Sequence, residues 1–258
     1  MTEGVVLLIG TRRGLFRAES DGSRTGWTLQ GPEVAGYEVY HALLDPRDPA
    51  TGYAAVKHEV WGAQMYRTRD AGKTWQPLEA RPSFTADSGR DVTAIWHLAP
   101  GGVTEPGVVY AGVEPAALFV SPDEGESWER IESLEQHPSA AAWQPAKGGL
   151  ALHSIQVDAE DPDRIFAAVS AGGAYRSSDR GTTWVAINQG VRADFLPDPR
   201  PEAGQCVHSL RLHPQSTDRL YQQNHCGTYR TDDAGETWFE ITAGLPSEFG
   251  YVMGIDPA

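Results

Sequence analysis

The chain has 258 residues and a mass of 28.0 kDa, and 40% of its residues are apolar while 22% are charged. This balance excludes a coiled coil, a collagen-like repeat and a wholly disordered chain. The formal charge of −14 argues against nucleic acids and anionic membranes as partners, because the field of the protein repels phosphate groups.

The N-terminal stretch MTEGVVLLIGTRRGLF places an acidic residue before an apolar run and cationic residues after it. This order is the reverse of a secretory signal, and no apolar run reaches the length of a membrane-spanning helix. We therefore expect a cytoplasmic protein. In that compartment its two cysteines, Cys206 and Cys226, are thiols or ligands rather than parts of a disulfide framework.

An octet of the pattern S/T-x-D-x-G-x-S/T-W occurs four times along the chain. The copies are TRDAGKTW from Thr68, SPDEGESW from Ser121, SSDRGTTW from Ser177 and TDDAGETW from Thr231. Each octet follows a strand-like run containing Tyr or Phe, and a further strand ending in an Asp/Pro turn lies upstream. Four strands in each repeat of about 55 residues predict the antiparallel blades of a β-propeller.

The sequence therefore predicts one all-β domain, a propeller of four-stranded blades spanning residues 1–258. The N-terminal fragment resembles the last three strands of a blade, and the C-terminal GYVMGIDPA resembles a lone first strand. Pairing of this segment with residues 5–10 would close a ring of five blades and leave no exposed edge. The alternative is a larger propeller that has been cut after Pro257.

The octets are Asp-boxes, and the chain resembles the BNR/Asp-box propeller superfamily, which includes sialidases, xyloglucanase-type hydrolases, sorting-receptor ectodomains and photosystem assembly factors. Through GTRRGLF at Gly10, YAGVEPAALFVS at Tyr110 and GVRADFLP at Gly190, it looks most like bacterial sialidase-like or glycosyl hydrolase-like proteins. In such octets the carboxylate accepts local backbone N–H groups, Gly takes a positive φ and Trp is buried between blades. We expect Asp70, Asp123, Asp179 and Asp233 to stabilise turns on the face opposite the functional site.

A histidine recurs near the start of the first strand in four successive repeats. These residues are His41, His97, His153 and His208, which are 56, 56 and 55 residues apart. The first strand of a propeller blade is innermost, so these side chains are expected to converge at one end of the axis. Antiparallel pairing brings the ends of the second strands to the same end. The residues expected there include Glu114, His225 and Arg12.

Imidazoles accompanied by a carboxylate suit a divalent transition metal such as Zn, Fe, Cu or Ni. The sequence thus predicts an axial metal site with His41, His97, His153, His208 and His225 as ligands. Glu114, His97 and Arg12 are the predicted catalytic residues. The alternatives are a polar small-molecule pocket without metal and a structural role for histidines that were repeated by duplication. Cys206 and Cys226 lie near this set as soft ligands, a reactive thiol pair or inert fillers.

Three long connections, near residues 81–92, 135–149 and 190–205, are predicted to cross the same face as the histidines. They offer Trp143, Lys147, Arg192 and Asp194 as residues that would bind a sugar or another small polar molecule.

These features favour a metal-dependent enzyme or a small-molecule-binding protein. The first alternative is a sialidase-like glycoside hydrolase, although the F/Y-R-I-P motif and the arginine triad of sialidases are missing from the sequence. A generic glycosidase would instead need two carboxylates, for which Glu114 with Asp194 or Glu59 are candidates. The second alternative is a non-enzymatic binding or assembly propeller, which would not require repeated histidines.

Overall fold

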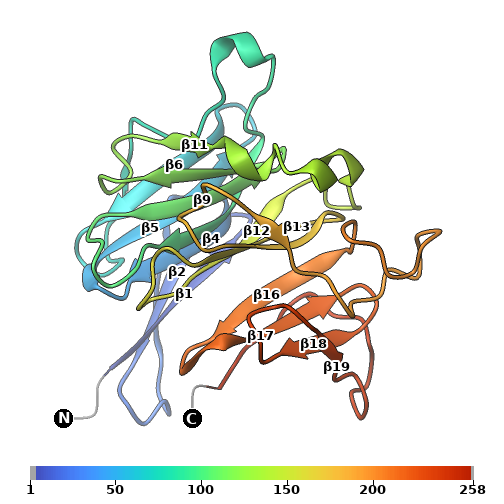
Figure 1. Ribbon diagram of the computed structural model, residues 1–258. Helices are drawn as coiled ribbons and strands as arrows, with labels where there is room; N and C mark the ends of the chain where they lie inside the picture. The colour runs from blue at the N-terminus through green and yellow to red at the C-terminus, as the bar shows by residue number, and fades with distance from the viewer. Residues whose placement is uncertain (1–3, 257–258) are drawn as a thin grey trace.

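The computed structural model describes residues 4–256 as five antiparallel sheets that follow one another along the chain (Figure 1). The first sheet contains β1 (Val5–Thr11), β2 (Gly14–Ser20) and β3 (Thr28–Glu33). The second contains β4 (Glu38–Asp45), β5 (Asp48–His58), β6 (Gly62–Thr68) and β7 (Gln76–Pro77). The third contains β8 (Ala94–Pro100), β9 (Val109–Glu114), β10 (Ala117–Ser121) and β11 (Glu129–Ile131).

The fourth sheet contains β12 (Leu152–Val157), β13 (Ile165–Val169), β14 (Gly173–Ser177) and β15 (Val185–Ala186). The fifth contains β16 (Val207–His213), β17 (Ser216–Asn224), β18 (Thr228–Thr231) and β19 (Phe239–Glu240). Short 3-10 helices cover Ala86–Ser88, Glu132–Leu134 and Pro138–Ala142. Within residues 4–256, no helix has the length and apolar character needed to cross a membrane.

The strands of every sheet lie in sequence order, and the first strands of neighbouring sheets pack against each other. Thus β1 contacts β4, β4 contacts β8, β8 contacts β12 and β12 contacts β16. Middle strands such as β13 (IFAAV) are buried on both faces because neighbouring sheets cover them, which explains their continuous apolar sequence. The prediction of an all-β, propeller-like arrangement of blades is confirmed.

The four octets form nearly identical turns between the third and fourth strands of their sheets. In the first, Asp70 Oδ1 accepts hydrogen bonds from the Thr68 hydroxyl and the Thr74 N–H, at 2.8 and 2.9 Å, and Oδ2 accepts one from the Thr74 hydroxyl at 2.7 Å. The same three bonds recur at Asp123, Asp179 and Asp233. Ala71 and Gly72 both have positive φ, of 60° and 81°. The turns therefore close on local bonds, as the sequence predicts.

The hydrogen bonds to Asp70 make the stability of the protein depend on acidity. The hydrogen bond from the Thr74 N–H has the largest effect, and together these bonds lower the pKa of Asp70 from 3.8 to about 2. A carboxylate with a depressed pKa stabilises the fold above its unfolded pKa, and this contribution is lost as pH falls from about 4 to about 2. Asp70→Asn is expected to lower the free energy of unfolding by about 1 kcal/mol at pH 7.

The variant should also lose part of the wild-type decrease in stability between pH 4 and pH 2, and urea unfolding at several pH values measures both effects. Glu79→Gln, a change at an exposed carboxylate of the same sheet region that lies outside the octet, serves as the control. An unaltered pH dependence in Asp70→Asn would show that this carboxylate does not stabilise the turn.

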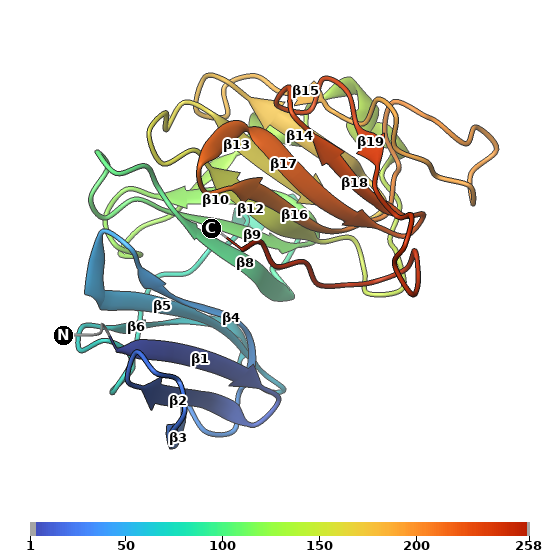
Figure 2. The ribbon, with the colours of Figure 1, turned by 90° about the horizontal axis from the view of Figure 1, so that it is seen from below.

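The C-terminal segment lies along β16 instead of pairing with β1. The Gly250 carbonyl oxygen is 2.6 Å from His208 Nδ1, and the Met253 carbonyl accepts a hydrogen bond of 3.4 Å from Arg211 Nε. The β1–β3 sheet and the β16–β19 sheet lie at opposite ends of the series of five sheets (Figure 2). The predicted closure through residues 5–10 is not confirmed, because polar side chains of β16 hold the segment to its own sheet. Pro257 lies outside the described residues.

Candidate functional site

Most of the predicted site residues lie at one edge of the five sheets, and we call this edge the rim. It is the edge at which the first strands begin and the second strands end, as the pairs Glu38 with Lys57 and Ala94 with Glu114 show. The fourth strands also end there, so the three long connections between sheets cross the rim. The octet turns follow the third strands and lie at the opposite edge.

The four recurring histidines do not occupy equivalent positions. In the register of the sheets, the aromatic residues Tyr53, Tyr110, Phe166 and Tyr221 pair with Leu43, Ala99, Gln156 and Arg211. Two residues before these partners stand His41, His97, Ser154 and Ser209. Hydrogen bonds between sheets support the equivalence of His41 and Ser154. The Leu98 N–H donates to His41 Nδ1 at 3.3 Å, and the Leu210 N–H donates to Ser154 Oγ at 3.2 Å. The predicted alignment is wrong by one residue in the last two sheets.

A bulge near the start of each of these first strands carries the true equivalents. The residues at the bulges are Tyr40, Trp96, His153 and His208. Bulges re-aim a side chain relative to the rest of the strand. Reasoning from the spacing of histidines missed Tyr40 and Trp96. The aromatic residues of the second strands carry the signal that would have found them.

His97 is buried and His41 is half-buried beside it, with ring centroids 4.4 Å apart. Burial lowers the pKa of His41 to about 4 and that of His97 well below its usual value, so both rings are neutral at pH 7. They line a cavity of about 620 Å³ together with Arg211 and Gln156. Among the described residues, neither ring nor that of His153 belongs to a group of three or more His, Cys, Asp or Glu side chains able to hold one ion.

A hollow of about 500 Å³ lies on the rim next to the first two sheets. We call it the rim hollow, and it is lined by Arg12, Gly36, Glu38, Lys57 and Glu59. Arg12 is almost fully exposed, and its Nε lies 3.6 Å from Glu38 Oε1. The rim hollow thus presents two carboxylates and two cations to solvent.

An aromatic pair lies within electrostatic reach of residues that line the rim hollow. The rings of Tyr40 and Trp96 meet edge to face, with centroids 5.2 Å apart. Burial, followed by the charges of Glu38 and Glu114, raises the pKa of Tyr40. Tyr40 therefore lies within the electrostatic reach of a carboxylate of the rim hollow and of Glu114.

Glu114 is held in a fixed position at the end of β9. The Trp96 indole N–H donates a 3.1 Å hydrogen bond to Glu114 Oε2. On the other side Gly149, with a φ of 98°, approaches so closely that a Cβ there would lie 2.1 Å from Oε1. Gly149 ends a tight turn that contains Lys147 and closes on Ala146. The structure therefore brings the predicted residues Glu114 and Lys147 to one part of the rim, and the charge of Arg12 also acts on Tyr40.

Three of the residues predicted to bind substrate have structural partners instead. Trp143 is buried in the core, and its indole N–H donates a 2.7 Å hydrogen bond to the Tyr175 hydroxyl. The Arg192 guanidinium bonds to the Asp194 carboxylate and to Glu240 at 2.9 Å. These bonds tie the connection 190–205 to β19, so Arg192 and Asp194 hold the loop in place.

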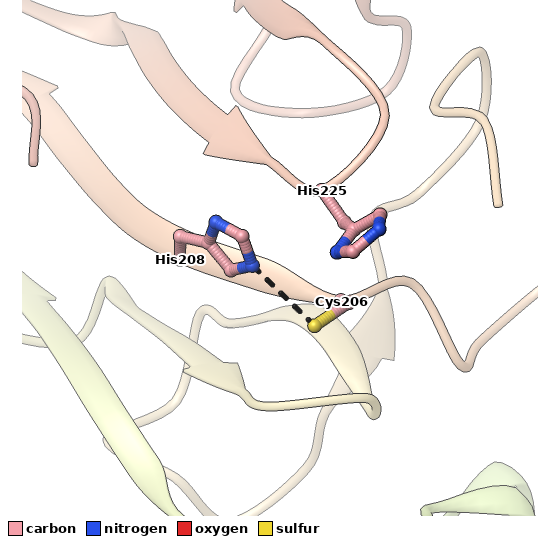
Figure 3. A group of neighbouring side chains, drawn as sticks. All are labelled: Cys206, His208 and His225. Carbon is pink, nitrogen blue, oxygen red and sulfur yellow. Dashed lines mark hydrogen bonds between the residues drawn. The ribbon is translucent and has the colours of Figure 1, made fainter. Parts of the chain in front are cut away.

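A second group of polar side chains lies on the rim of the fifth sheet. Cys206, His208 and His225 point toward one another (Figure 3), and one ligand atom from each lies within 4.8 Å of the others. We call these three residues the sulfur–imidazole cluster. Of the predicted metal ligands, only His208 and His225 come together there, and Cys206 joins them.

The five sheets define this chain as an all-β, propeller-like protein. Its sequence relatives include xyloglucanases. It is 26% identical over 229 residues to an oligoxyloglucan-reducing end-specific xyloglucanase of Emericella nidulans, covering 76% of this chain and 27% of that relative. It is also 27% identical over 140 residues to vacuolar protein sorting/targeting protein 10 of Chaetomium globosum, covering 54% of this chain and 8% of the relative. No protein-family model matches the chain.

Solved structures agree on the fold. The GH74 xyloglucanase from Xanthomonas campestris superimposes with a TM-score of 0.56 at 19% identity, covering 93% of this chain and 44% of that structure. An ancestral GH74 enzyme superimposes with a TM-score of 0.55 at 16% identity, covering 80% of this chain and 24% of that structure. The chain spans about a quarter of the length of the xyloglucanase of Emericella nidulans.

Proposed function

We propose that this chain binds a polysaccharide across its rim and acts as a glycoside hydrolase, with the rim hollow and Glu114 as its site. The observation that carries the proposal is the hydrogen bond between Glu114 and Trp96, whose ring pairs with Tyr40, together with the charge of Glu38 in the rim hollow, which also acts on Tyr40. Similarity to xyloglucanases supports a sugar chain as the substrate class. A metal-dependent reaction receives no such support from the relatives.

The chemistry follows from the types of residue present. Glycoside hydrolysis uses two carboxyl groups on either side of the scissile bond, one to protonate the leaving oxygen and one to activate water or attack the sugar. We assign the first role to Glu114, whose position is fixed by Trp96 and Gly149, and the second to Glu38. Of the two partners predicted from sequence, Asp194 is engaged by Arg192, whereas Glu59 shares the rim hollow with Glu38.

The surrounding residues supply binding contacts. The aromatic faces of Tyr40 and Trp96 offer flat apolar surface for sugar rings, as is typical of sites with a few convergent polar groups. Arg12 and Lys57 supply hydrogen-bond donors for sugar hydroxyls. A sialic acid carboxylate would require a cluster of arginines, and Arg12 is the single arginine among the residues that line the rim hollow.

The proposal is tested with the purified chain and a panel of xyloglucan oligosaccharides, cello-oligosaccharides and sialyllactose. We expect binding of the glucan-derived oligosaccharides by calorimetry and release of new reducing ends from at least one of them, with no turnover of sialyllactose. Tyr40→Ala is expected to weaken this binding at least several-fold, because it removes half of the aromatic pair. A protein that binds none of the neutral oligosaccharides would refute the proposal.

A further inference from the structure

We propose that the sulfur–imidazole cluster, Cys206, His208 and His225, is a binding site for a thiophilic divalent metal ion, with Zn²⁺ as the ion that fits best. The cluster lies on the fifth sheet and is separate from the rim hollow beside the first two sheets. The proposal therefore stands independently of the polysaccharide site.

The local fold brings the three side chains together. Cys206 immediately precedes β16, His208 stands at the bulge of β16, and His225 immediately follows β17. Because β16 and β17 are antiparallel neighbours, the beginning of one lies beside the end of the other. The His225 N–H donates a 2.9 Å hydrogen bond to the Cys206 carbonyl, which fixes the two backbones at this point.

The spacing of the donor atoms matches tetrahedral coordination. Cys206 Sγ lies 3.6 Å from His208 Nε2. With Zn–S near 2.3 Å and Zn–N near 2.0–2.1 Å, a tetrahedral angle requires about 3.6 Å between sulfur and nitrogen. Two of the three ligand atoms are thus already at the separation that the ion needs. A thiolate with imidazoles is also the donor set that borderline and soft metals prefer.

His208 Nδ1, the nitrogen that would not bind the metal, makes the kind of hydrogen bond that is common in metal-binding histidines. His208 Nδ1 lies 2.6 Å from the Gly250 carbonyl oxygen, which can only accept a hydrogen bond. The proton therefore resides on Nδ1, and the lone pair of Nε2 faces Cys206. Such a bond from the outer nitrogen to a carbonyl orients metal-binding histidines. The Tyr251 ring stacks on the imidazole with centroids 4.8 Å apart, which further restricts its rotation.

The third proposed ligand, His225, is the one whose side chain is free to rotate. His225 is exposed, and its ring makes edge contacts with Phe195 and Phe249, with centroids 5.5 and 5.2 Å away. Because this imidazole is exposed and its nitrogen already lies within 4.8 Å of the other two ligand atoms, the proposal requires only that it rotate to complete the coordination sphere. Three protein ligands leave the fourth position of a tetrahedral ion to water or another small ligand.

The test uses the untagged full chain, stripped with a chelator and then titrated with ZnCl₂ or CoCl₂. We expect one equivalent of Zn²⁺ to remain after gel filtration. We also expect Co²⁺ to give the intense visible bands of a tetrahedral site together with a sulfur-to-cobalt charge-transfer band in the near ultraviolet. His225→Ala is expected to weaken Zn²⁺ affinity at least about tenfold. Because the residue is exposed, this variant should retain the fold.

Cys206→Ser should abolish the charge-transfer band. Cys226→Ser and His213→Ala are the matched controls, since they change another buried thiol of the same sheet and an imidazole at the far end of β16. Circular dichroism of the metal-free variants verifies that each is folded. Retention of only a small fraction of an equivalent of Zn²⁺ would overturn the proposal, as would equal loss of the charge-transfer band in Cys226→Ser and Cys206→Ser. In the first case the cluster would be a thiol–imidazole hydrogen bond. In the second case the ion would not be held by the three proposed ligands alone.

Discussion

Replacing Glu114 by glutamine is expected to lower kcat for the proposed glucan hydrolysis by about 10²–10⁴-fold while KM changes little. Glutamine keeps the size of the side chain and can still accept the hydrogen bond from the Trp96 indole N–H. It removes only the group that gives or takes a proton, so binding of the sugar chain should persist. Initial rates with the best oligosaccharide of the panel, together with calorimetric affinity, separate the two effects.

Glu38→Gln is expected to cause a comparable loss, and Glu129→Gln is the control. Glu129 is an exposed carboxylate on β11, the outermost strand of the third sheet. Gly149→Ala provides an independent check, because a Cβ at this position would displace the Glu114 carboxylate without removing it. A Glu114→Gln enzyme with wild-type kcat would exclude Glu114 from proton transfer.

Gly112→Ala is expected to destabilise the fold by about 3 kcal/mol. Gly112 lies in the middle strand β9 of the third sheet, where a Cβ would stand 2.3 Å from the Leu152 carbonyl oxygen and 2.5 Å from Leu152 Cδ2. The first of these atoms belongs to the backbone of β12, so no rotation of a side chain relieves the clash. The third and fourth sheets would have to separate at their interface.

Urea unfolding followed by tryptophan fluorescence measures this effect, and Gly26→Ala is the matched control. A Cβ at Gly26 meets no atom within 4 Å, so this variant should unfold close to the wild type. An unchanged unfolding midpoint in Gly112→Ala would mean that the two sheets are packed less tightly than the structure shows.

The sequence was sufficient for the blade pattern because the octet interactions are local. Asp70 bonds to residues two, three and four positions away, so the turn forms wherever the octet occurs. The expectation that the long connections and the ends of the second strands share one edge followed from strand alternation alone. For the same reason Glu114 and Lys147 were correctly predicted to lie on the rim.

The remaining features depend on interactions between residues distant in the sequence. All four first strands carry the bulge, but His41 and His97 follow it by one residue whereas His153 and His208 stand at it. This difference of one residue barely alters the spacing of the histidines, so Tyr40 and Trp96 were missed as the equivalents of His153 and His208. Arg192 forms a hydrogen bond with Glu240, which is 48 residues away, and no local sequence pattern predicts that contact.

The order of strands, the position of the turns and the face that carries the polar groups were determined by the sequence itself, because each depends on contacts within one repeat. Only the tertiary structure decided that the C-terminal segment lies on β16, that Cys206 joins two histidines, and that Trp143 belongs to the core. The physical reason is that each of these groups has several possible hydrogen-bond partners or apolar surfaces to pack against. That competition is resolved only when whole sheets pack together.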